Sequence, residues 1–234
     1  PSIDNPYFAT IASEIVFEAK RYGYTVILLD TLEDEGNESE CINTLLTRSI
    51  DGIILVPCGE RPESLEKIDE QTPIVLIDRY FEDTSLSYIC TDNYRGALDG
   101  VKLLIENGHK EILCIRGVPH SMPSKERVKG YIDALRESGF DTRSRITGND
   151  YSITNGYLET KLAIGSPARP TAIFALSNTI MLGAIRAIGE SSLRIPDDVS
   201  ILSFDNNLFL DFLHPAVTRI SQPTKEISQL AVKI

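Results

Sequence analysis

Segments with the apolar spacing of helices alternate with short, almost entirely apolar runs along nearly the whole chain. The alternation is clear where "RGALDGVKLLIENG" (95–108) precedes "HKEILCIRG" (109–117), and where "NTIMLGAIRAIGE" (178–190) precedes "DVSILSFD" (198–205). Apolar residues three and four positions apart predict helices, whereas a short continuous apolar run is typical of a parallel strand covered on both faces. The pattern therefore predicts an α/β fold of parallel sheets with helices on both sides.

The first helix is predicted from residue 7 to residue 22, because Asn5 is a suitable N-cap and Pro6 suits the first helical position. The apolar run "YTVILLD" (24–30) that follows is predicted to be a buried strand. The remaining predicted elements are helices at 39–50, 63–71, 124–139, 154–165 and from 223 onward, and strands at 51–57, 72–78, 171–176 and 217–220.

This number of strands exceeds what one twisted open sheet usually holds, so two lobes are expected. No Gly/Ser-rich or Pro-rich linker separates them, and short chain crossings are expected at 89–93 and 219–223. The expected lobes are residues 1–91 with 221–234, and residues 92–220. In this alternation a strand precedes each helix, so the strand before Asn5 is expected to be missing and the chain to be a fragment.

Charge and composition exclude several functions for this segment. With 34 acidic and 23 basic residues the formal net charge is -11, and such a surface is unsuited to lie along DNA. No apolar run reaches the roughly 18 residues that a membrane helix needs, so no membrane partner is expected. The four cysteines are scattered without metal-ligand pairs, which favours free thiols in a reducing cytoplasm.

Motifs of catalysis and of cofactor binding do not occur at the expected places. The sequence has no Gly-x-Ser-x-Gly elbow, and no phosphate-binding glycine loop follows any predicted strand. The three histidines have no metal-ligand spacing. The sequence therefore predicts a protein that is not an enzyme and that uses neither a cofactor nor a metal.

A run of motifs in register carries a resemblance to a known family. The motifs are "NPYF", "RSIDGIILVP", "PIVLIDR", "TDNYRGA", "LIENGHKEILCIRG", "ERVKGYIDALRESG", "PTAIFALSN", "LGAIRAIGE", "RIPDDVSILSFD" and "HPAVTRI". Together they resemble the effector-binding domain of the lac-repressor and gal-repressor family of bacterial transcription factors, over essentially the whole chain.

The resemblance implies two Rossmann-like lobes with parallel sheets, of the type I periplasmic-binding-protein kind, clamped on a small ligand. Three chain crossings would join the lobes, the third of them beyond Ile234, and a homodimer would form through both lobes. It also implies a hinge and a helix-turn-helix domain before the missing strand, neither of which is present in this chain.

Ligands of parallel α/β sheets bind beyond the carboxyl ends of the strands, where loops enter helices. Arg127 lies near the start of the helix after 109–117, and the resemblance implies that its guanidinium clamps the effector. Asn178 and Asp205 follow two further strands and are implied effector contacts. From the residues alone, the alternatives are a solvated helix face for Arg127, a cap of the following helix for Asn178 and a cap of the following turn for Asp205.

Aromatic and amide side chains complete the predicted effector site. Tyr7 and Phe8 open the first helix and are candidates for stacking on the effector, with a place in the helix core as the alternative. Tyr151 matches an aromatic position that stacks on the effector in the resembling family. Gln222 lies on a crossing from which it is expected to reach the cleft.

Three further residues at strand ends, Asp78, Arg79 and Asp92, are predicted to make inter-lobe or crossing contacts, with hydrogen bonds to nearby loops as the alternative. At one position the chain departs from the resembling family, because Thr179 stands where an Asp usually follows the Asn. This departure bears on the polarity of the ligand.

The sequence therefore predicts a ligand-responsive bacterial transcriptional regulator of the repressor type in the cytoplasm. This segment would bind a small effector, a sugar or sugar derivative with a purine as the alternative, in the cleft between the lobes and would mediate dimerisation. Operator DNA would bind to the absent helix-turn-helix domain. The alternative is a secreted periplasmic-type sugar-binding protein, which predicts a signal peptide and a monomer.

Overall fold

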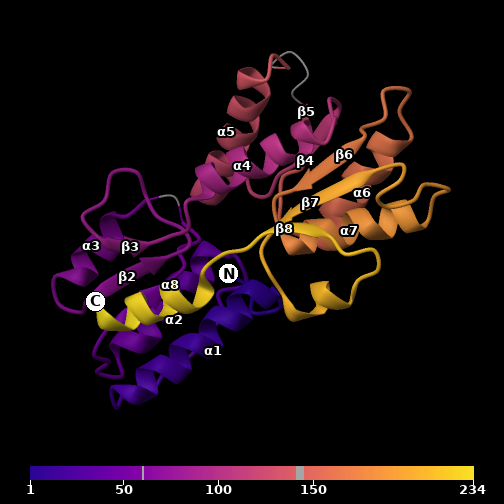
Figure 1. The fold of residues 1–234 in the computed structure, drawn as a ribbon. Coiled ribbons are helices and arrows are strands. Elements are labelled where there is room, and N and C mark those ends of the chain that lie inside the picture. The colour runs from indigo at the N-terminus through magenta and orange to yellow at the C-terminus, as the bar shows by residue number, and fades with distance from the viewer. Residues whose placement is uncertain (60, 141–144) are drawn as a thin grey trace. The chain divides into compact units, whose positions relative to one another are not determined.

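A computed structural model describes residues 1–59, 61–140 and 145–234, and divides the chain into two compact units (Figure 1). The first unit contains Pro1–Thr91 and Pro223–Ile234, and the second contains Asp92–Gln222. The chain thus passes from one unit to the other twice, after Thr91 and after Gln222.

The second unit is built on one five-stranded sheet in which every described pairing is parallel and the strand order is β5-β4-β6-β7-β8. Its strands are β4 (Ile112–Ile115), β5 (Arg145–Thr147), β6 (Ala172–Ala175), β7 (Ser200–Phe204) and β8 (Thr218–Ile220). Its helices are α4 (Asn93–Glu106), α5 (Met122–Glu137), α6 (Ile153–Ile164) and α7 (Asn178–Gly189), with a 3-10 turn η2 (Leu208–Phe212) before β8.

Helices cover both faces of this sheet, with α4 and α5 on one side and α6 and α7 on the other (Figure 1). Successive side chains of a strand point to opposite faces, so Ile112 and Cys114 pack toward α4 and α5, whereas Leu113 and Ile115 pack toward α6 and α7. This two-sided burial explains why β4 is a continuous apolar run in the sequence.

Backbone-to-backbone packing of α6 on α7 depends on small residues. A Cβ added at Gly156 would lie 2.0 Å from the carbonyl oxygen of Ile180, and one at Gly183 would lie 2.1 Å from that of Ile153. The two helices therefore fix each other's N-terminal turns, which adjoin the carboxyl ends of the strands.

The first unit has a smaller parallel sheet of order β1-β2-β3, made by β1 (Ile53–Leu55), β2 (Ile74–Ile77) and β3 (Ser87–Ile89). Its helices are α1 (Pro6–Arg21), α2 (Glu35–Leu46), α3 (Glu63–Asp69) and α8 (Thr224–Lys233). One apolar cluster joins α1 and α8 to one face of the sheet, and a second joins α2 and α3 to the other face.

The start of α1 follows the sequence prediction. Asn5 is the N-cap, and its Oδ1 accepts a hydrogen bond from the backbone N–H of Tyr7 at 3.1 Å, while Pro6 is the first helical residue.

The strand predicted at 24–30 is wrong for this structure. The segment has no strand assignment, takes part in none of the strand pairings found among the described residues, and leaves Leu28 55% exposed. An apolar run becomes a strand only when a neighbouring strand supplies its hydrogen bonds. The sequence pattern reports the apolar character of the run but not whether a partner strand is at hand.

Two further expectations concern the cysteines and membranes. None of Cys41, Cys58, Cys90 and Cys114 is in a disulfide bond, and Cys114 in β4 is fully buried. Among the described residues, no helix is both long enough and apolar enough to cross a bilayer.

Candidate functional site

The second unit brings four of the sequence-predicted residues to the carboxyl edge of its sheet. Asn178 begins α7 after β6, Asp205 follows β7, Gln222 follows β8, and Arg127 lies on α5, the helix after β4. Their exposed fractions are 0% for Asn178, 3% for Asp205, 6% for Gln222 and 3% for Arg127. Buried polar side chains of this kind need partners, and the contacts of each one define what the site can bind.

Arg127 is held in place by three contacts. Its Nε donates to Oδ1 of Asn93 at 2.8 Å, and its Nη1 donates to the backbone carbonyl of Leu176 at 2.6 Å. Its guanidinium also lies 3.8 Å from the ring centroid of Phe204, a cation–π stack. The solvated helix face considered from the sequence is therefore wrong for Arg127, although it holds for exposed Lys125 and Lys129 on the same helix.

Asp205 is held between two neighbours. Its Oδ1 accepts a hydrogen bond from Nε2 of Gln222 at 2.5 Å, and its Oδ2 accepts one from the backbone N–H of Asn178 at 3.4 Å. Its backbone has a φ of 78°, in the left-handed region that costs non-glycine residues free energy. Strain of this kind persists where the surroundings fix the residue and is concentrated at functional sites.

At Asn178 both polar atoms of the side chain lack a hydrogen-bond partner in the described part of the chain, whereas Ser124, Thr147 and Asn207 each have a single such atom. Both Oδ1 and Nδ2 are buried and have no hydrogen-bond partner among the described residues. The cap role considered from the sequence is wrong, because Ser177 is the N-cap of α7 and its hydroxyl accepts from the N–H of Ile180 at 3.2 Å. An unpaired buried amide costs stability, so a ligand that pairs with it gains affinity.

Tyr151 precedes α6 and is half-buried beside the same edge. Its hydroxyl shares a hydrogen bond with the hydroxyl of Ser121 at 3.2 Å. The hydroxyl of Thr179 donates to the backbone carbonyl of Tyr151 at 2.5 Å, so the residue that departs from the family pattern is part of this arrangement.

Sequence reasoning missed Asn93 and chose its neighbour Asp92. The exposed Asp92 is the N-cap of α4 and accepts from the N–H of Arg95 at 2.8 Å, which is the loop-type hydrogen bond considered as the alternative. Asn93 is 1% exposed and contacts Arg127. The only signal in the sequence was the pair of adjacent polar residues, Asp92 and Asn93, at a predicted crossing. That signal does not indicate which of the two side chains faces the interior.

In the first unit, Arg79 follows β2 and makes a two-point ion pair with Glu33, at 2.7 Å and 2.9 Å. Burial acts to raise the pKa of Glu33, but the hydrogen bonds and charge of Arg79 outweigh it and hold that pKa below its usual value. Asp78 is buried with a φ of 64°, a left-handed backbone like that of Asp205.

The two aromatic residues at the start of α1 differ in burial. Tyr7 is 3% exposed and belongs to the apolar cluster beneath α1, whereas Phe8 is half-buried. Their ring centroids are 5.1 Å apart in an edge-to-face arrangement, and the guanidinium of Arg79 lies 5.9 Å from the centroid of Phe8. Of the two, Phe8 is the more accessible.

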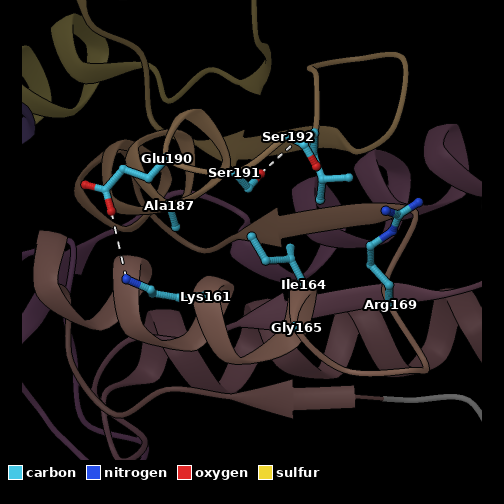
Figure 2. A pocket seen from close by; sticks show the side chains of 9 residues that line it. Lys161, Ile164, Gly165, Arg169, Ala187, Glu190, Ser191 and Ser192 are labelled. Atoms are coloured by element: carbon cyan, nitrogen blue, oxygen red, sulfur yellow. Dashed lines mark hydrogen bonds and ion pairs between the residues drawn. The ribbon is translucent and has the colours of Figure 1, made fainter.

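A cavity of about 380 Å³ lies at the opposite edge of the second sheet (Figure 2). It is lined by residues at the C-terminal ends of α6 and α7, which adjoin the amino ends of the strands. In Figure 2 Lys161 points toward Glu190, 3.9 Å away in an exposed ion pair. Ligands of parallel sheets bind at the other edge, and this cavity contains no buried polar group in need of a partner.

No group of three or more metal-ligating side chains is found in the described part of the chain. Carboxylate, amide and guanidinium groups at the carboxyl edge of the second sheet instead offer donors and acceptors to a neutral polar ligand.

A family model described as periplasmic binding proteins and sugar-binding domain of the LacI family matches residues 1–232. The chain belongs to this family. The HTH-type transcriptional repressor CytR of Escherichia coli K12 is 33% identical over 99% of this chain and 69% of its own length. Catabolite control protein A of Priestia megaterium is 30% identical over 100% of this chain and 71% of its own length.

Solved structures agree with this assignment. A probable LacI family transcriptional regulator from Corynebacterium glutamicum has a TM-score of 0.93 at 27% identity, covering 100% of this chain and 90% of its own. A putative ribose operon repressor from Burkholderia thailandensis has a TM-score of 0.88 at 33% identity, covering 100% and 87%. The chain therefore has the effector-domain fold of LacI-family regulators, and its relatives are transcriptional regulators rather than enzymes.

Proposed function

We propose that this chain is the effector-binding segment of a transcriptional repressor and that its effector binds at the carboxyl edge of the second unit's sheet. The observation that carries the proposal is Asn178, which is fully buried and whose amide atoms find no hydrogen-bond partner in the described part of the chain. Such an arrangement costs stability in the ligand-free protein, and a ligand with a neighbouring donor and acceptor removes that cost.

A sugar or sugar derivative is the class of effector that suits this edge best. A hydroxyl group both donates and accepts, and so does the amide of Asn178, while Asp205 accepts and Arg127 donates. The half-buried ring of Tyr151 suits the C–H face of a sugar, and also suits the flat face of a purine. The name of the relative from Burkholderia thailandensis supports ribose as a first probe.

Regulation follows if effector binding favours one of two arrangements of the protein. The effector changes DNA affinity only by its differential affinity for those arrangements. Operator DNA would bind through a separate helix-turn-helix domain in the cytoplasm, because this segment with its formal net charge of -11 is unsuited to lie along DNA. Two predictions from the sequence remain untested. One is that Tyr7 and Phe8 of the first unit also contact the effector. The other is that Asp78 and Arg79 make contacts between the units.

A homodimer is the proposed assembly, and exposed apolar side chains of the second unit support it. Leu158 and Leu162 on α6 are 51% and 73% exposed, and Phe212 in η2 is 77% exposed. Large apolar side chains gathered on an exposed helix are typical of surfaces that a partner covers.

The family description also covers periplasmic binding proteins, so a secreted sugar-binding protein is the second candidate. The two candidates differ in assembly, because a repressor that reads a two-fold operator is a dimer whereas the secreted protein is a monomer. The names of the relatives from Escherichia coli and Priestia megaterium support the repressor.

A thermal-shift screen tests the proposed site. The wild-type protein, Arg127→Ala and Asp205→Asn are heated with monosaccharides, disaccharides, sugar phosphates and nucleosides. A ligand at one hundred times its dissociation constant adds about 2.7 kcal/mol of stability. The proposal predicts that one ligand class raises the melting temperature of the wild type and of neither variant. An equal shift in all three proteins contradicts it.

A further inference from the structure

The ring of Tyr151 packs directly against the backbone at Gly117. A Cβ built on Gly117 would lie 2.1 Å from Cε1 and 2.2 Å from Cζ of Tyr151. No side chain larger than hydrogen fits there, because real Cβ contacts are not shorter than about 3 Å. Gly117 follows β4 at the carboxyl edge of the sheet, so the ring packs against the backbone of this edge.

Hydrogen bonds fix both ends of the same residue. At the outer end, the Tyr151 hydroxyl shares a hydrogen bond with Ser121, the N-cap of α5, at 3.2 Å. At the backbone end, Oγ1 of Thr179 donates to the Tyr151 carbonyl at 2.5 Å. The ring, its hydroxyl and its carbonyl are therefore held by three different segments of the second unit.

Thr179 is itself oriented by its neighbour. The hydroxyls of Ser177 and Thr179 are 2.8 Å apart, and Ser177 Oγ accepts from the N–H of Ile180. A threonine hydroxyl has a single proton, and Thr179 donates it to the Tyr151 carbonyl. Ser177 is therefore the donor in the hydrogen bond between the Ser177 and Thr179 hydroxyls. Ser177 and Thr179, the residues on either side of Asn178, thus form a chain of two hydrogen bonds: Ser177 donates to Thr179, and Thr179 donates to the backbone carbonyl of Tyr151.

We propose that Thr179 is a positioning residue that fixes Tyr151 as a rigid aromatic wall of the ligand site. The inference rests on the proposed function, because it takes the Asn178 edge to be the place where the effector binds. A rigid wall favours ligands with a flat apolar face at one set distance and lowers the ordering cost of binding. An aspartate at this position only accepts hydrogen bonds and repels the Tyr151 carbonyl, so the threonine is what makes this arrangement possible.

The first arm of the test needs no ligand. NMR spectra of protein with 13C-labelled tyrosine rings follow Tyr151, whose signal is assigned by its loss in Tyr151→Phe. Thr179→Val keeps the shape of the side chain but removes the donor, and Thr179→Asp supplies only acceptors. Both are expected to move the Tyr151 ring signals, whereas Thr179→Ser, which keeps the hydroxyl, is expected to leave them in place. Unchanged Tyr151 signals in Thr179→Val overturn the proposal.

The second arm is a double-mutant cycle in ligand affinity, measured with D-ribose and with adenosine, which joins a ribose to a purine. Thr179→Val is expected to raise the dissociation constant roughly three- to tenfold, the worth of about one hydrogen bond. In a Tyr151→Ala background the same substitution is expected to have no further effect, because Thr179 acts through Tyr151. An equal loss in both backgrounds overturns the proposal, since Thr179 would then act on the ligand or on the fold directly.

The two arms separate failure of this inference from failure of the proposed function. If neither probe binds the wild-type protein, the proposed ligand class is contradicted, and the NMR spectra alone decide whether Thr179 positions Tyr151. If a probe binds and the Tyr151 ring signals do not change on substitution of Thr179, the proposed effector site is retained and the positioning role of Thr179 is wrong.

Discussion

Gln222 donates a hydrogen bond to Asp205 at 2.5 Å, and the two side chains are 6% and 3% exposed. Gln222 is the last residue of the second unit before the chain passes to the first. The contact therefore ties the strained end of β7 to the point where the chain leaves the unit. Any ligand that engages the Asp205 carboxylate competes with, or adds to, this bond.

Replacing the donor of this bond by an acid is predicted to destabilise the protein in a pH-dependent way. In Gln222→Glu two carboxylates would lie within hydrogen-bond distance, so one of them binds a proton more tightly in the folded state than in the unfolded state. Stability then falls as the pH rises from 5 to 7.5, and urea unfolding at both pH values measures it. Gln71→Glu, on the surface, is the control, and an equal pH effect in both variants would contradict the account.

Removing the unpaired amide of Asn178 is predicted to leave stability unchanged or to raise it. Asn178→Leu keeps a similar volume and deletes two buried polar atoms that have no partner within residues 1–59, 61–140 and 145–234, each of which costs about 1–3 kcal/mol. Asn155→Leu is the matched control, because the Asn155 amide is buried but donates to the carbonyls of Arg116 and Asp150 at 3.1 Å and 2.6 Å.

Urea midpoints of these two variants give the comparison. Asn155→Leu is predicted to lose about 1–3 kcal/mol, because the two carbonyls are left without their donor. A loss of the same size in Asn178→Leu would show that the Asn178 amide is satisfied in the folded protein, and the main support for the effector site would then be lost.

In the first unit, ionisation of Glu38 is predicted to lower the free energy of unfolding as the pH rises. Glu38 belongs to α2, and its buried carboxylate accepts a hydrogen bond from the N–H of Cys58 at 2.7 Å. Burial raises the pKa of Glu38, against the lowering effect of the bonds from Cys58, and nearby Glu35 adds to the rise. Between the unfolded and folded pKa values the folded state binds more protons, so its stability decreases as the pH rises through that range.

The test compares the wild type with Glu38→Gln, which keeps an oxygen for the Cys58 N–H but does not titrate. Urea unfolding is measured at several pH values from 4.5 to 8. The stability of Glu38→Gln relative to that of the wild type is predicted to increase with pH. The contributions of the other carboxylates are the same in both proteins and cancel in this stability difference. A difference that stays constant, or that has the opposite sign, would refute the assignment of the raised pKa.

A charge on α6 is predicted to break the proposed homodimer. Leu162 is 73% exposed, so Leu162→Glu disturbs little in the folded unit itself but places a charge in an apolar interface. Leu103→Glu is the control, because Leu103 is 43% exposed on α4, which covers the opposite face of the sheet. Sedimentation analysis should find Leu162→Glu monomeric at concentrations at which the wild type and the control are dimers. A wild type that is a monomer throughout would favour the secreted binding protein.

The sequence predicts most elements of this fold because their signals are local and strong. The cap at Asn5, the apolar spacing of α7 and the continuous apolar run of β4 each depend on a few neighbouring residues. The short strands β3 and β5 were not predicted, since "SYI" and "RIT" carry polar residues and lie at sheet edges. The strand predicted at 24–30 was wrong for the opposite reason. Its apolar pattern is strong, but a strand forms only beside a partner strand, and the local sequence does not report one.

The candidate site was predictable in its members but not in its contacts. Arg127, Asn178, Asp205 and Gln222 follow strand ends and meet at one edge, as the topology of a parallel sheet requires. No sequence rule predicts that Phe204 stacks on Arg127 or that Gly117 supports Tyr151, since these pairs are far apart in sequence. The unpaired state of the Asn178 amide depends on every neighbour around it, and only the structure reveals it.

The assignment of the effector to the Asn178 edge is tested by isothermal titration calorimetry on wild-type protein and Asn178→Leu, with the compound that gives the largest thermal shift in the wild type. The Asn178→Leu variant is predicted to be at least as stable as the wild type and to bind the compound at least tenfold more weakly, by about 1.4 kcal/mol. Equal affinity in the two proteins would contradict the assignment of the effector to the carboxyl edge of the second unit.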